Sequence, residues 1–387
     1  MVVIDPEFVV PAVPEEDQYE GTEIDENVLK ALPPGLTIEW AATSGASFWA
    51  FNSKIDTILP DGTEQSYFLK VYTTERAGDI ARGEYEGLKA MKAVIPENIP
   101  NPVAWGLCAR DPSRSFFIAE FRYLDDDLPA MSELVDLVGQ LHSGQTSPNG
   151  KFGFHTTTFC GRLPNDNRWC DTWEEYFTRN IRELMSVELA THGPHEELER
   201  LSAIVLDKVI PRLLRPMETE GRSIRPTLVH GDLWHGNVSI DAETMEPVLY
   251  DPGCFYGHHE YDFSMWRAAR YRTSQVHVKY YFDKFGASEP TEDKDGRNML
   301  YAMRSDLAVS VLWSANKAIR GLAIEGMRRL VAEYGEGYER YLARRAGGGL
   351  VESQATTGEH TAAPAAPGAN AVQRRVIEAM PIPAAGA

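Results

Sequence analysis

The most informative stretch of this chain is His230-Gly231-Asp232-Leu233-Trp234-His235-Gly236-Asn237, and Asp251-Pro252 begins fourteen residues after Asn237. Both segments follow short apolar runs, at 227–230 and 247–250, that predict strands. An Asp, an Asn five residues later and a second Asp after a strand form a pattern that phosphoryl transfer requires, because that reaction is catalysed mainly by positioning and electrostatics. Asp232 would accept the proton of an acceptor hydroxyl, while Asn237 and Asp251 would supply oxygen ligands for Mg²⁺. Two Asx-rich turns are the alternative interpretation.

A second component lies upstream, in a strand predicted over 66–72 that carries Lys70. A lysine on a strand can reach the phosphates of ATP as a point charge. On the helix predicted over 76–94, Glu84 shares the apolar face of Ile80 and Leu88. Because a lone acid in an apolar stripe needs a partner, we expect Glu84 to pair with Lys70. An exposed strand lysine is the alternative for Lys70.

The third component is the loop Ser44-Gly45-Ala46-Ser47, between the first two predicted strands. Its backbone N–H groups and the hydroxyls of Ser44 and Ser47 could contact phosphate, although Gly45 is its single glycine. An ordinary hairpin loop is the alternative.

The periodicity of the chain predicts an α+β architecture in two lobes. Strands are expected at 37–41, 48–59, 66–72 and 115–121, with a hairpin turn at Asp61-Gly62. Helical periodicity dominates after residue 125, including helices expected over 299–320 and 322–343. The predicted division is a small β-rich nucleotide-binding lobe over 31–124 and a larger helical lobe over 125–345, with a cleft between them.

Both ends of the chain are biased in composition. Residues 1–30 contain nine acids and one base, which predicts a flexible acidic leader. Residues 346–387 contain 12 Ala, 6 Gly and 4 Pro, which predicts a disordered tail. With 38 Lys+Arg and 57 Asp+Glu, the net charge of −19 argues against binding to nucleic acid or to anionic membrane surfaces.

Several other classes of protein have little support. The four cysteines show no CxxC spacing, so we expect reduced thiols, and the N-terminus lacks the features of a targeting peptide, so we expect a cytosolic protein. The histidine-containing segments 230–235 and 258–262 match no established metal-ligand spacing, and His230 is expected to be structural. A GxSxG elbow and a GxGxxG fingerprint are both absent from the sequence.

Three segments resemble the fructosamine kinase (ketosamine-3-kinase) family, a branch of the kinase-like phosphotransferases that includes aminoglycoside and choline kinases. HGDLWHGN at 230–237 looks like the family's HGDLWxGN, and DPGCFYGHHEYD at 251–262 looks like its DPxxFYGHxExD. KFGFHT at 151–156, continuing through Cys160-Gly161 to Trp169 and Trp173, looks like a stretch that is specific to this family. The resemblance covers most of 37–340.

The resemblance implies a bilobal protein-kinase-like fold with ATP and Mg²⁺ in the cleft. It implies transfer of the γ-phosphate to the sugar 3-hydroxyl of a ribulosamine or fructosamine on a glycated protein lysine, which repairs the protein because the product is unstable. By position, the resemblance assigns Asp232 as catalytic base, Asn237 and Asp251 as metal ligands, and Lys70 with Glu84 to the phosphates. It further assigns Asp262 as a structural brace of the catalytic loop. The hinge strand at Ala119, Glu120 and Phe121 is expected to bind adenine. Trp234 and His155 are candidate substrate contacts.

The sequence departs from the family at His235, which stands beside the catalytic loop where a small residue is usual. This difference puts the identity of the acceptor in doubt more than the catalysis. Two alternatives stay open: a related kinase acting on another small-molecule hydroxyl, as aminoglycoside and choline kinases do, and a non-catalytic pseudokinase. The second is disfavoured because Lys70, Asp232, Asn237 and Asp251 are all present.

Overall fold

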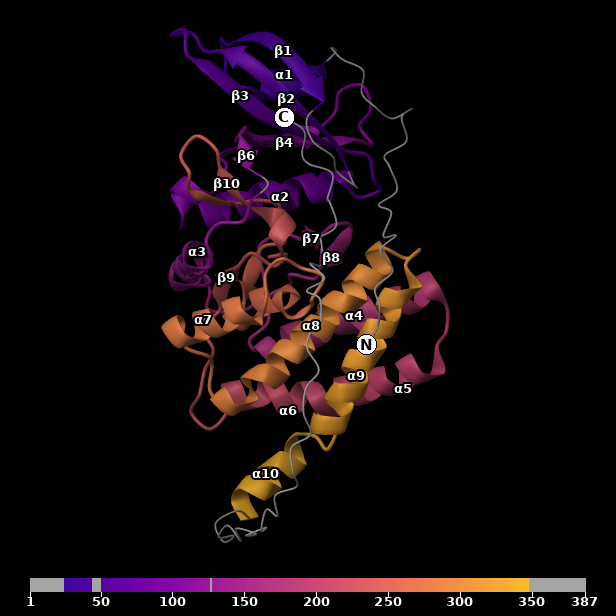
Figure 1. Ribbon diagram of the computed structural model, residues 1–387. Helices are drawn as coiled ribbons and strands as arrows, with labels where there is room; N and C mark the ends of the chain where they lie inside the picture. Colours follow the sequence, from indigo (N-terminus) through magenta and orange to yellow (C-terminus); the bar gives the residue numbers. More distant parts are fainter. Residues whose placement is uncertain (1–23, 44–49, 126, 348–387) are drawn as a thin grey trace, which may run out of the picture.

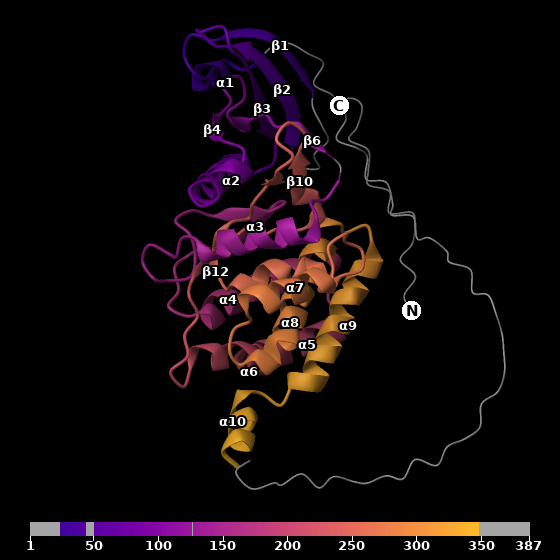
Figure 2. The same ribbon diagram turned by 60° about the vertical axis from the view of Figure 1, so that its left-hand side comes forward.

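The computed structural model describes residues 24–43, 50–125 and 127–347. A β-sheet region lies at one end of the molecule, a larger helical region lies at the other, and helix α10 projects away from the helical region (Figures 1 and 2). The α+β class and the protein-kinase-like arrangement expected from the sequence are both confirmed. Ser44, Gly45, Ser47 and most of both expected tails lie outside the described residues.

The β-sheet region is built from one antiparallel sheet with the strand order β1-β2-β3-β5-β4. Its strands are β1 (Thr37–Thr43), β2 (Ala50–Ile58), β3 (Glu64–Tyr72), β4 (Pro102–Leu107) and β5 (Ser115–Glu120), and helix α2 (Ala77–Lys92) connects β3 to β4. Strand β5 shows why the sheet is covered on both faces, since successive side chains point to opposite sides. Phe117 and Ala119 join the apolar cluster that includes α2, whereas Phe116 and Ile118 join a separate cluster on the other face.

The sequence analysis missed strand β4, whose sequence PVAWGL contains a proline and a glycine. Both residues weaken a strand prediction, and a proline is tolerated on an edge strand, which is where β4 lies. The register shifts between Pro102 and Ala104. A side chain at Gly106 would meet the ring of Phe116 at 3.0 Å, so the ring would have to shift slightly to admit one.

The predicted flexible leader over 1–30 is wrong for its last residues. Helix α1 (Glu26–Ala31) covers the outer face of the sheet, with Val28 1% exposed. Asp25 caps this helix through the N–H of Asn27 (2.9 Å) and also accepts the N–H groups of Ala109 (2.8 Å) and Arg110 (3.0 Å). The acidic residue that suggested a solvated leader therefore fastens α1 to the loop after β4.

The helical region surrounds a core in which the indole N–H of Trp173 donates to the hydroxyl of Tyr301 at 2.8 Å. Its α-helices are α3 (Met131–Ser143), α4 (Trp173–His192), α5 (Glu196–Ile204), α6 (Ile210–Leu214), α7 (Gln275–Phe285), α8 (Lys294–Leu312), α9 (Lys317–Tyr334) and α10 (Tyr338–Gly347). A π-helical turn, η3 (Val205–Val209), joins α5 to α6. The other short turns are η2 (Pro96–Asn98), η4 (Arg215–Glu218), η5 (His235–Asn237), η6 (His259–Phe263), η7 (Met265–Arg267) and η8 (Thr291–Asp293).

The helix boundary predicted near residue 321 is wrong, because the chain turns earlier. Helix α8 ends at Leu312, and Asn316 then caps α9 by accepting the N–H of Ala318. The sequence signal for this boundary is the capping asparagine, which the apolar periodicity of the flanking helices obscures. Helix α10 begins after Gly337, whose φ of +87° favours glycine.

Short strands connect the two regions and carry the loops of interest. Strand β9 (Thr227–Val229) pairs with β12 (Phe255–Gly257), and β10 (Val238–Asp241) pairs with β11 (Pro247–Leu249). The apolar runs predict β9 and β11, whereas the sequence analysis missed β10 and β12. Strand β6 (Leu124–Asp125) follows the five-stranded sheet in the chain and pairs with β10, which ties the linker between the regions to the helical region. The last pair is β7 (Thr158–Cys160) with β8 (Leu163–Asn165).

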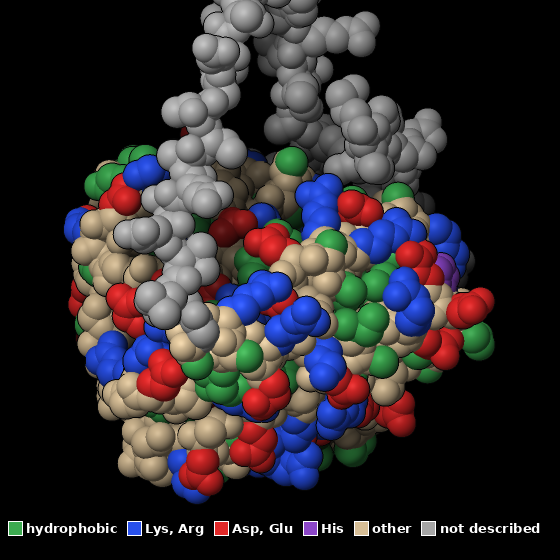
Figure 3. Space-filling view, turned by 90° about the horizontal axis from the view of Figure 1, so that it is seen from below, with side chains coloured by type: hydrophobic (Ala, Val, Ile, Leu, Met, Phe, Trp, Pro, Cys, Tyr) green, Lys and Arg blue, Asp and Glu red, His purple; other side chains and the backbone are tan. Residues whose placement is uncertain are grey.

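Acidic and basic side chains alternate on the face seen from the helical end (Figure 3). Ion pairs also occur between side chains that are largely buried, such as Arg212 with Asp293 (2.7 Å). Among the residues that the structure describes, none of the helices combines the length and apolarity needed to cross a bilayer.

We predict that Asp25→Ala lowers the free energy of unfolding by about 1–3 kcal/mol, because three buried or partly buried N–H groups lose their acceptor. Burial acts to raise the pKa of Asp25, but the backbone hydrogen bonds outweigh it and lower the pKa below 3.8. A lowered pKa stabilises the fold above the unfolded value, so the difference from wild type should be constant from about pH 8 to 5 and shrink below about pH 4.

Urea unfolding across this pH range measures the effect. Glu26→Ala is the matched control, since the side chain of Glu26 is 71% exposed and should change stability by no more than about 0.5 kcal/mol. Equal losses for the two variants would contradict the role of Asp25.

Candidate active site

The loop that carries Asp232 leaves strand β9 at Val229 through a tight turn. Gly231 has a φ of +80°, and a side chain there would lie 2.4 Å from the carbonyl oxygen of Gly253. Glycine is therefore required by both conformation and space. This close approach brings the loop after β9 against the loop after β11, which carries Asp251.

Asp262 stabilises this turn through hydrogen bonds to its backbone. Its two carboxylate oxygens accept the N–H groups of His230 and Gly231, each at 2.8 Å. The carboxylate is buried and also contacts the ring of His142 at 3.0 Å. His230 is fully buried and its Nε2 lies 2.9 Å from the carbonyl oxygen of Tyr250, as expected of a structural histidine.

Asp232, Asn237 and Asp251 converge as the sequence spacing predicts. The amide nitrogen of Asn237 donates to the carbonyl oxygen of Asp232 (2.8 Å), to its Oδ2 (3.3 Å) and to the carbonyl oxygen of Asp251 (3.3 Å). Because the nitrogen of Asn237 makes these bonds, its side-chain oxygen is left for another partner. Burial raises the pKa of Asp232, while a hydrogen bond from Cys160 and the charges of His230 and Arg304 act to lower it.

Lys70 joins the two regions of the molecule. Its Nζ lies 3.2 Å from Oε1 of Glu84 and 2.8 Å from Oδ1 of Asp251. Burial alone would lower the pKa of Lys70, but the charges of Asp251 and Glu84 raise it well above its ordinary value, so the amine stays protonated. Tyr72 donates a short hydrogen bond to Oε2 of Glu84. Burial raises the pKa of Glu84 to about 8, against the opposing charge of Lys70.

The surroundings of Asp251 suit a hard divalent cation. Its side chain is 44% exposed although Lys70 beside it is buried, and its backbone has a φ of +52°, which is unusual for a residue other than glycine. Burial acts to raise the pKa of Asp251, and the charge of Lys70 lowers it below the usual value, so the carboxylate is ionised. The carboxylate of Asp251 and the amide oxygen of Asn237 are hard oxygen donors of the kind that Mg²⁺ prefers.

The segment 151–173, which carries the family-specific motif, packs directly against these loops. Gly153 and Tyr256 exchange two backbone hydrogen bonds (3.0 and 2.8 Å). The side chains of Thr158 and Asn165 both donate to the carbonyl oxygen of Gly253 (3.1 and 3.2 Å). At the end of β7, the thiol of Cys160 donates to Oδ1 of Asp232 at 3.2 Å.

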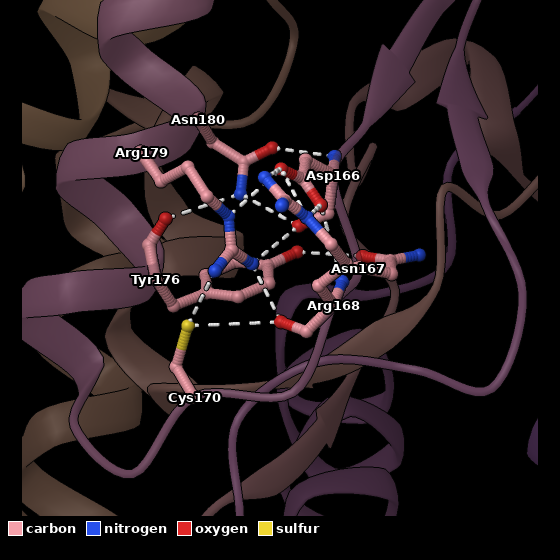
Figure 4. A network of polar contacts seen from close by, with 7 residues as sticks. All are labelled: Asp166, Asn167, Arg168, Cys170, Tyr176, Arg179 and Asn180. Atoms are coloured by element: carbon pink, nitrogen blue, oxygen red, sulfur yellow. Dashed lines mark hydrogen bonds and ion pairs between the residues drawn. The ribbon is translucent and has the colours of Figure 1, made fainter.

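Arg179 on α4 anchors the outer part of this segment (Figure 4). Its guanidinium donates to the carbonyl oxygens of Asp166 (2.9 Å) and Arg168 (2.5 Å) and to the sulfur of Cys170 (2.7 Å), and its Nε lies 2.9 Å from the carboxylate of Asp166. Asn180 adds bonds to the backbone of Asp166. Helix α4 therefore fixes the loop at 166–170, which belongs to the segment that packs against the Asp251 loop.

An aromatic cluster lies beside Asp232. The ring of Trp234 is 5.0 Å from that of His235 and 6.1 Å from that of Tyr271, measured between centroids. The N–H of Arg272 donates to Nδ1 of His235 at 3.4 Å. Burial, with the charge of Arg272, lowers the pKa of His235 to about 4, so its ring is neutral at pH 7. The cluster offers an uncharged aromatic wall next to the predicted base, with rings inclined at 59–80° to one another.

His155 does not join this cluster. Its ring is half exposed and its Nε2 lies 3.1 Å from the carboxylate of Glu86 on α2. Among the described residues this acid is its hydrogen-bonding partner. A direct substrate contact of His155 therefore has no support in the geometry.

The hinge prediction concerns the backbone at Glu120 and Phe121. The N–H of Glu120 donates to the carbonyl oxygen of Asn101 (2.8 Å) and that of Phe121 donates to the carbonyl oxygen of Ser66 (3.1 Å). Both donors are used within the sheet, so an adenine contact at these two residues would have to use other backbone groups. Within 50–125, the first backbone N–H past β5 without a hydrogen bond to another described residue is that of Arg122.

Sequence reasoning missed Tyr72, Cys160, Tyr271 and Arg304. Tyr72 stands two residues after Lys70, so its side chain points to the same face of the strand, which was a usable signal. The other three come from distant segments that only the fold brings to Asp232. Arg304 on α8 is 6% exposed and donates to Oδ1 of Asn165 at 3.4 Å.

The second histidine cluster is a structural network. The side chains of His258, His259 and Glu260 lie close enough to hold a metal ion. However, the ring nitrogens of His258 contact Tyr301 (2.9 Å) and Ser288 (2.8 Å), and Glu260 makes a buried bidentate pair with Arg297. Because these polar atoms are already satisfied, the geometry supports the sequence-based view that this cluster is not a metal site.

Solved structures define the class of fold. A candidate fructosamine-3-kinase from Thermobifida fusca aligns with a TM-score of 0.61 at 19% identity, covering 80% of this chain and 100% of that one. An aminoglycoside phosphotransferase in complex with AMP-PNP and hygromycin B aligns with a TM-score of 0.54 at 15% identity, covering 80% and 98%. The fold is thus that of the kinase-like phosphotransferases.

Sequence comparisons identify the family within this class. The profile of the fructosamine kinase family matches residues 53–319. The protein-ribulosamine 3-kinase of Oryza sativa subsp. indica is 33% identical over 52% of this chain and 55% of its own length. The ketosamine-3-kinase of Mus musculus is 31% identical over 51% of this chain and 68% of its own length. The chain belongs to the fructosamine kinase family, although it spans only about half the length of the rice relatives that it matches.

We predict that Gly231→Ala lowers the melting temperature and reduces phosphoryl transfer at least tenfold, because the new methyl group must push the Asp232 loop away from Gly253. Gly150→Ala is the matched control, since Gly150 also has a positive φ (+72°) but has no atom within 4 Å of a new side chain. The control should lose only the conformational contribution of about 1 kcal/mol and keep its activity. Similar behaviour of both variants in calorimetry and turnover would contradict the steric argument.

Proposed function

We propose that the protein transfers the γ-phosphoryl group of ATP to the sugar 3-hydroxyl of a ketosamine, a ribulosamine or fructosamine carried by a glycated protein lysine. The observation that carries this proposal is the joining of Asp232, Asn237 and Asp251 to the Lys70–Glu84 pair by direct contacts. The family-specific segment 151–173 packs against the same loops. Together they supply a base, a metal site and a phosphate-binding cation.

Each group has a separate part in the reaction. Asp232 accepts the proton of the attacking hydroxyl as the bond from oxygen to the γ-phosphorus forms, and the bond from that phosphorus to the oxygen of the β-phosphate breaks to release ADP. Lys70 orients the phosphates, with Glu84 and Tyr72 holding its side chain. Asn237 and Asp251 would hold Mg²⁺, which neutralises charge on the transferred group when bound.

The adenine of ATP would bind at the linker after β5. The candidate partners there are the carbonyl oxygens of Glu120 and Phe121 and the N–H of Arg122, which makes no hydrogen bond to another described backbone group. The side chain of Arg122 is tied to Glu120 (3.1 Å) and Asp241 (2.9 Å), so the linker is held on both sides of the expected adenine site. Ser44, Gly45 and Ser47 stay candidates for phosphate contact.

The acceptor is proposed from the relatives, which are named for ribulosamine and ketosamine substrates. The aromatic wall of Trp234, His235 and Tyr271 suits the apolar face of a sugar ring. His235 is larger than the small residue usual at this position in the family, so it reduces the space for the acceptor. This favours a compact acceptor. A kinase of another small-molecule hydroxyl is the second candidate, supported by the likeness in fold to the aminoglycoside phosphotransferase.

We expect Asp232→Asn to reduce kcat by about 10²–10⁴, because the amide cannot accept the hydroxyl proton. Release of ADP in the presence of acceptor measures the effect, and unchanged circular dichroism shows that the fold is kept. Asp171→Asn serves as control, since the side chain of Asp171 is 78% exposed and forms an ion pair with Lys151 at the surface. Near-wild-type turnover of the Asp232 variant would refute the assignment of the base.

A substrate panel tests the acceptor. We expect ADP release with ribulosyl-lysine and fructosyl-lysine, little with an aminoglycoside or choline, and loss of activity when EDTA removes Mg²⁺. Phosphorus NMR of the product should show a new ester on the sugar. Preferential turnover of the aminoglycoside or choline would favour the second candidate, and absence of turnover with every acceptor would refute the proposal.

A further inference from the structure

The proposed base is held by a residue from outside its own loop. Oδ1 of Asp232 accepts a hydrogen bond from the thiol of Cys160 at 3.2 Å, and Oδ2 accepts one from Asn237 at 3.3 Å. Each oxygen of the carboxylate thus has one fixed donor. Rotation of the Asp232 carboxylate about its Cβ–Cγ bond would break both hydrogen bonds. The two donors therefore fix the orientation of the carboxylate.

Cys160 is itself fixed at one end of the hairpin β7–β8. It stands opposite Leu163 in that hairpin and is 4% exposed. Two residues before it, Thr158 donates to the carbonyl oxygen of Gly253, and Asn167 donates to the hydroxyl of Thr158 at 2.9 Å. The thiol is therefore positioned by the backbone of the hairpin and by contacts with the Asp251 loop.

The electrostatic surroundings favour a thiol that donates rather than a thiolate. Burial raises the pKa of Cys160 well above its ordinary value, and the charge of Asp232 acts in the same direction. The proton therefore stays on sulfur at neutral pH. The buried cation Arg304 acts in the opposite direction and lowers the pKa of Cys160, but burial and the charge of Asp232 outweigh it.

We propose that Cys160 is a positioning residue for phosphoryl transfer: its thiol hydrogen bond fixes the carboxylate of Asp232 toward the acceptor hydroxyl. The inference rests on the proposed function, because it assigns Asp232 as the base. Through Cys160, the family-specific segment 151–173 orients the base, in addition to supporting the metal-binding loop.

The alternative is that Cys160 only fills space in the core. Cys254 provides the comparison, since it is also fully buried but makes no hydrogen bond with Asp232. A residue that only fills space would affect stability when it is changed, and its replacement would not alter kcat selectively. A positioning role therefore predicts a selective fall in kcat, whereas a space-filling role predicts a loss of stability without one.

The test compares Cys160→Ala and Cys160→Val, which cannot donate, with Cys160→Ser, which can. A hydrogen bond of this kind contributes about 1 kcal/mol, so kcat should fall about three- to tenfold in the Ala and Val variants, with KM for ATP and acceptor within about twofold of wild type. Cys160→Ser should keep kcat within about twofold, and the control Cys254→Ala should also keep it. The Val variant fills more of the site than Ala, so a folded variant without a donor remains available.

Equal losses of kcat in the Ser and Ala variants, unchanged kcat in both Ala and Val variants, or an effect confined to KM would overturn the inference. Failure of the proposed function shows itself separately, in the wild-type protein. If wild type transfers phosphate to another acceptor only, the substrate assignment fails and the same variants still test Cys160 with that acceptor. If wild type transfers phosphate to none, both proposals fail.

Discussion

The contact on which the arrangement depends is the salt bridge of Lys70 to both Glu84 and Asp251. One lysine on the sheet binds an acid of the neighbouring helix and an acid on a loop of the helical region, so a single charge fixes the sheet, α2 and the Asp251 loop together. A buried charge without partners would be unstable, and this one has two carboxylates and the face of Tyr72 at 5.4 Å. Lys70, Glu84 and Asp251 carry a net charge of −1 when all three are ionised. A bound divalent cation would make the net charge of the site positive.

Much of this arrangement could be predicted from the sequence. The helical periodicity of 80–91 places Glu84 on the inward face, and the spacing of Asp232, Asn237 and Asp251 predicts that they lie together, although they flank strands of two different sheets. These predictions succeed because both depend on local geometry, which repeats along the chain. The pairing of Lys70 with Glu84 follows from the need to neutralise a buried acid.

The missed features depend on contacts between distant segments. Cys160 meets Asp232 across 72 positions of sequence, and Asp25 meets Ala109 across 84, so neither pair has a local pattern. Strand β4 was missed because its proline and glycine are acceptable only at an edge, and the edge is a property of the assembled sheet. Which backbone N–H groups of the hinge are already hydrogen-bonded could not be predicted either, because the partners Asn101 and Ser66 are set by pairing in the sheet.

The network around Arg179 has a consequence for how this protein can diverge from its relatives. Arg179 holds the loop through the carbonyl oxygens of Asp166 and Arg168, which every amino acid provides, and through the side chains of Asp166 and Cys170. The other side chains of the loop can therefore change during evolution without loosening it, as long as these contacts are retained. The exposed rim of the family-specific segment, including the 77% exposed side chain of Arg168, is thus free to vary while the inner face keeps its shape.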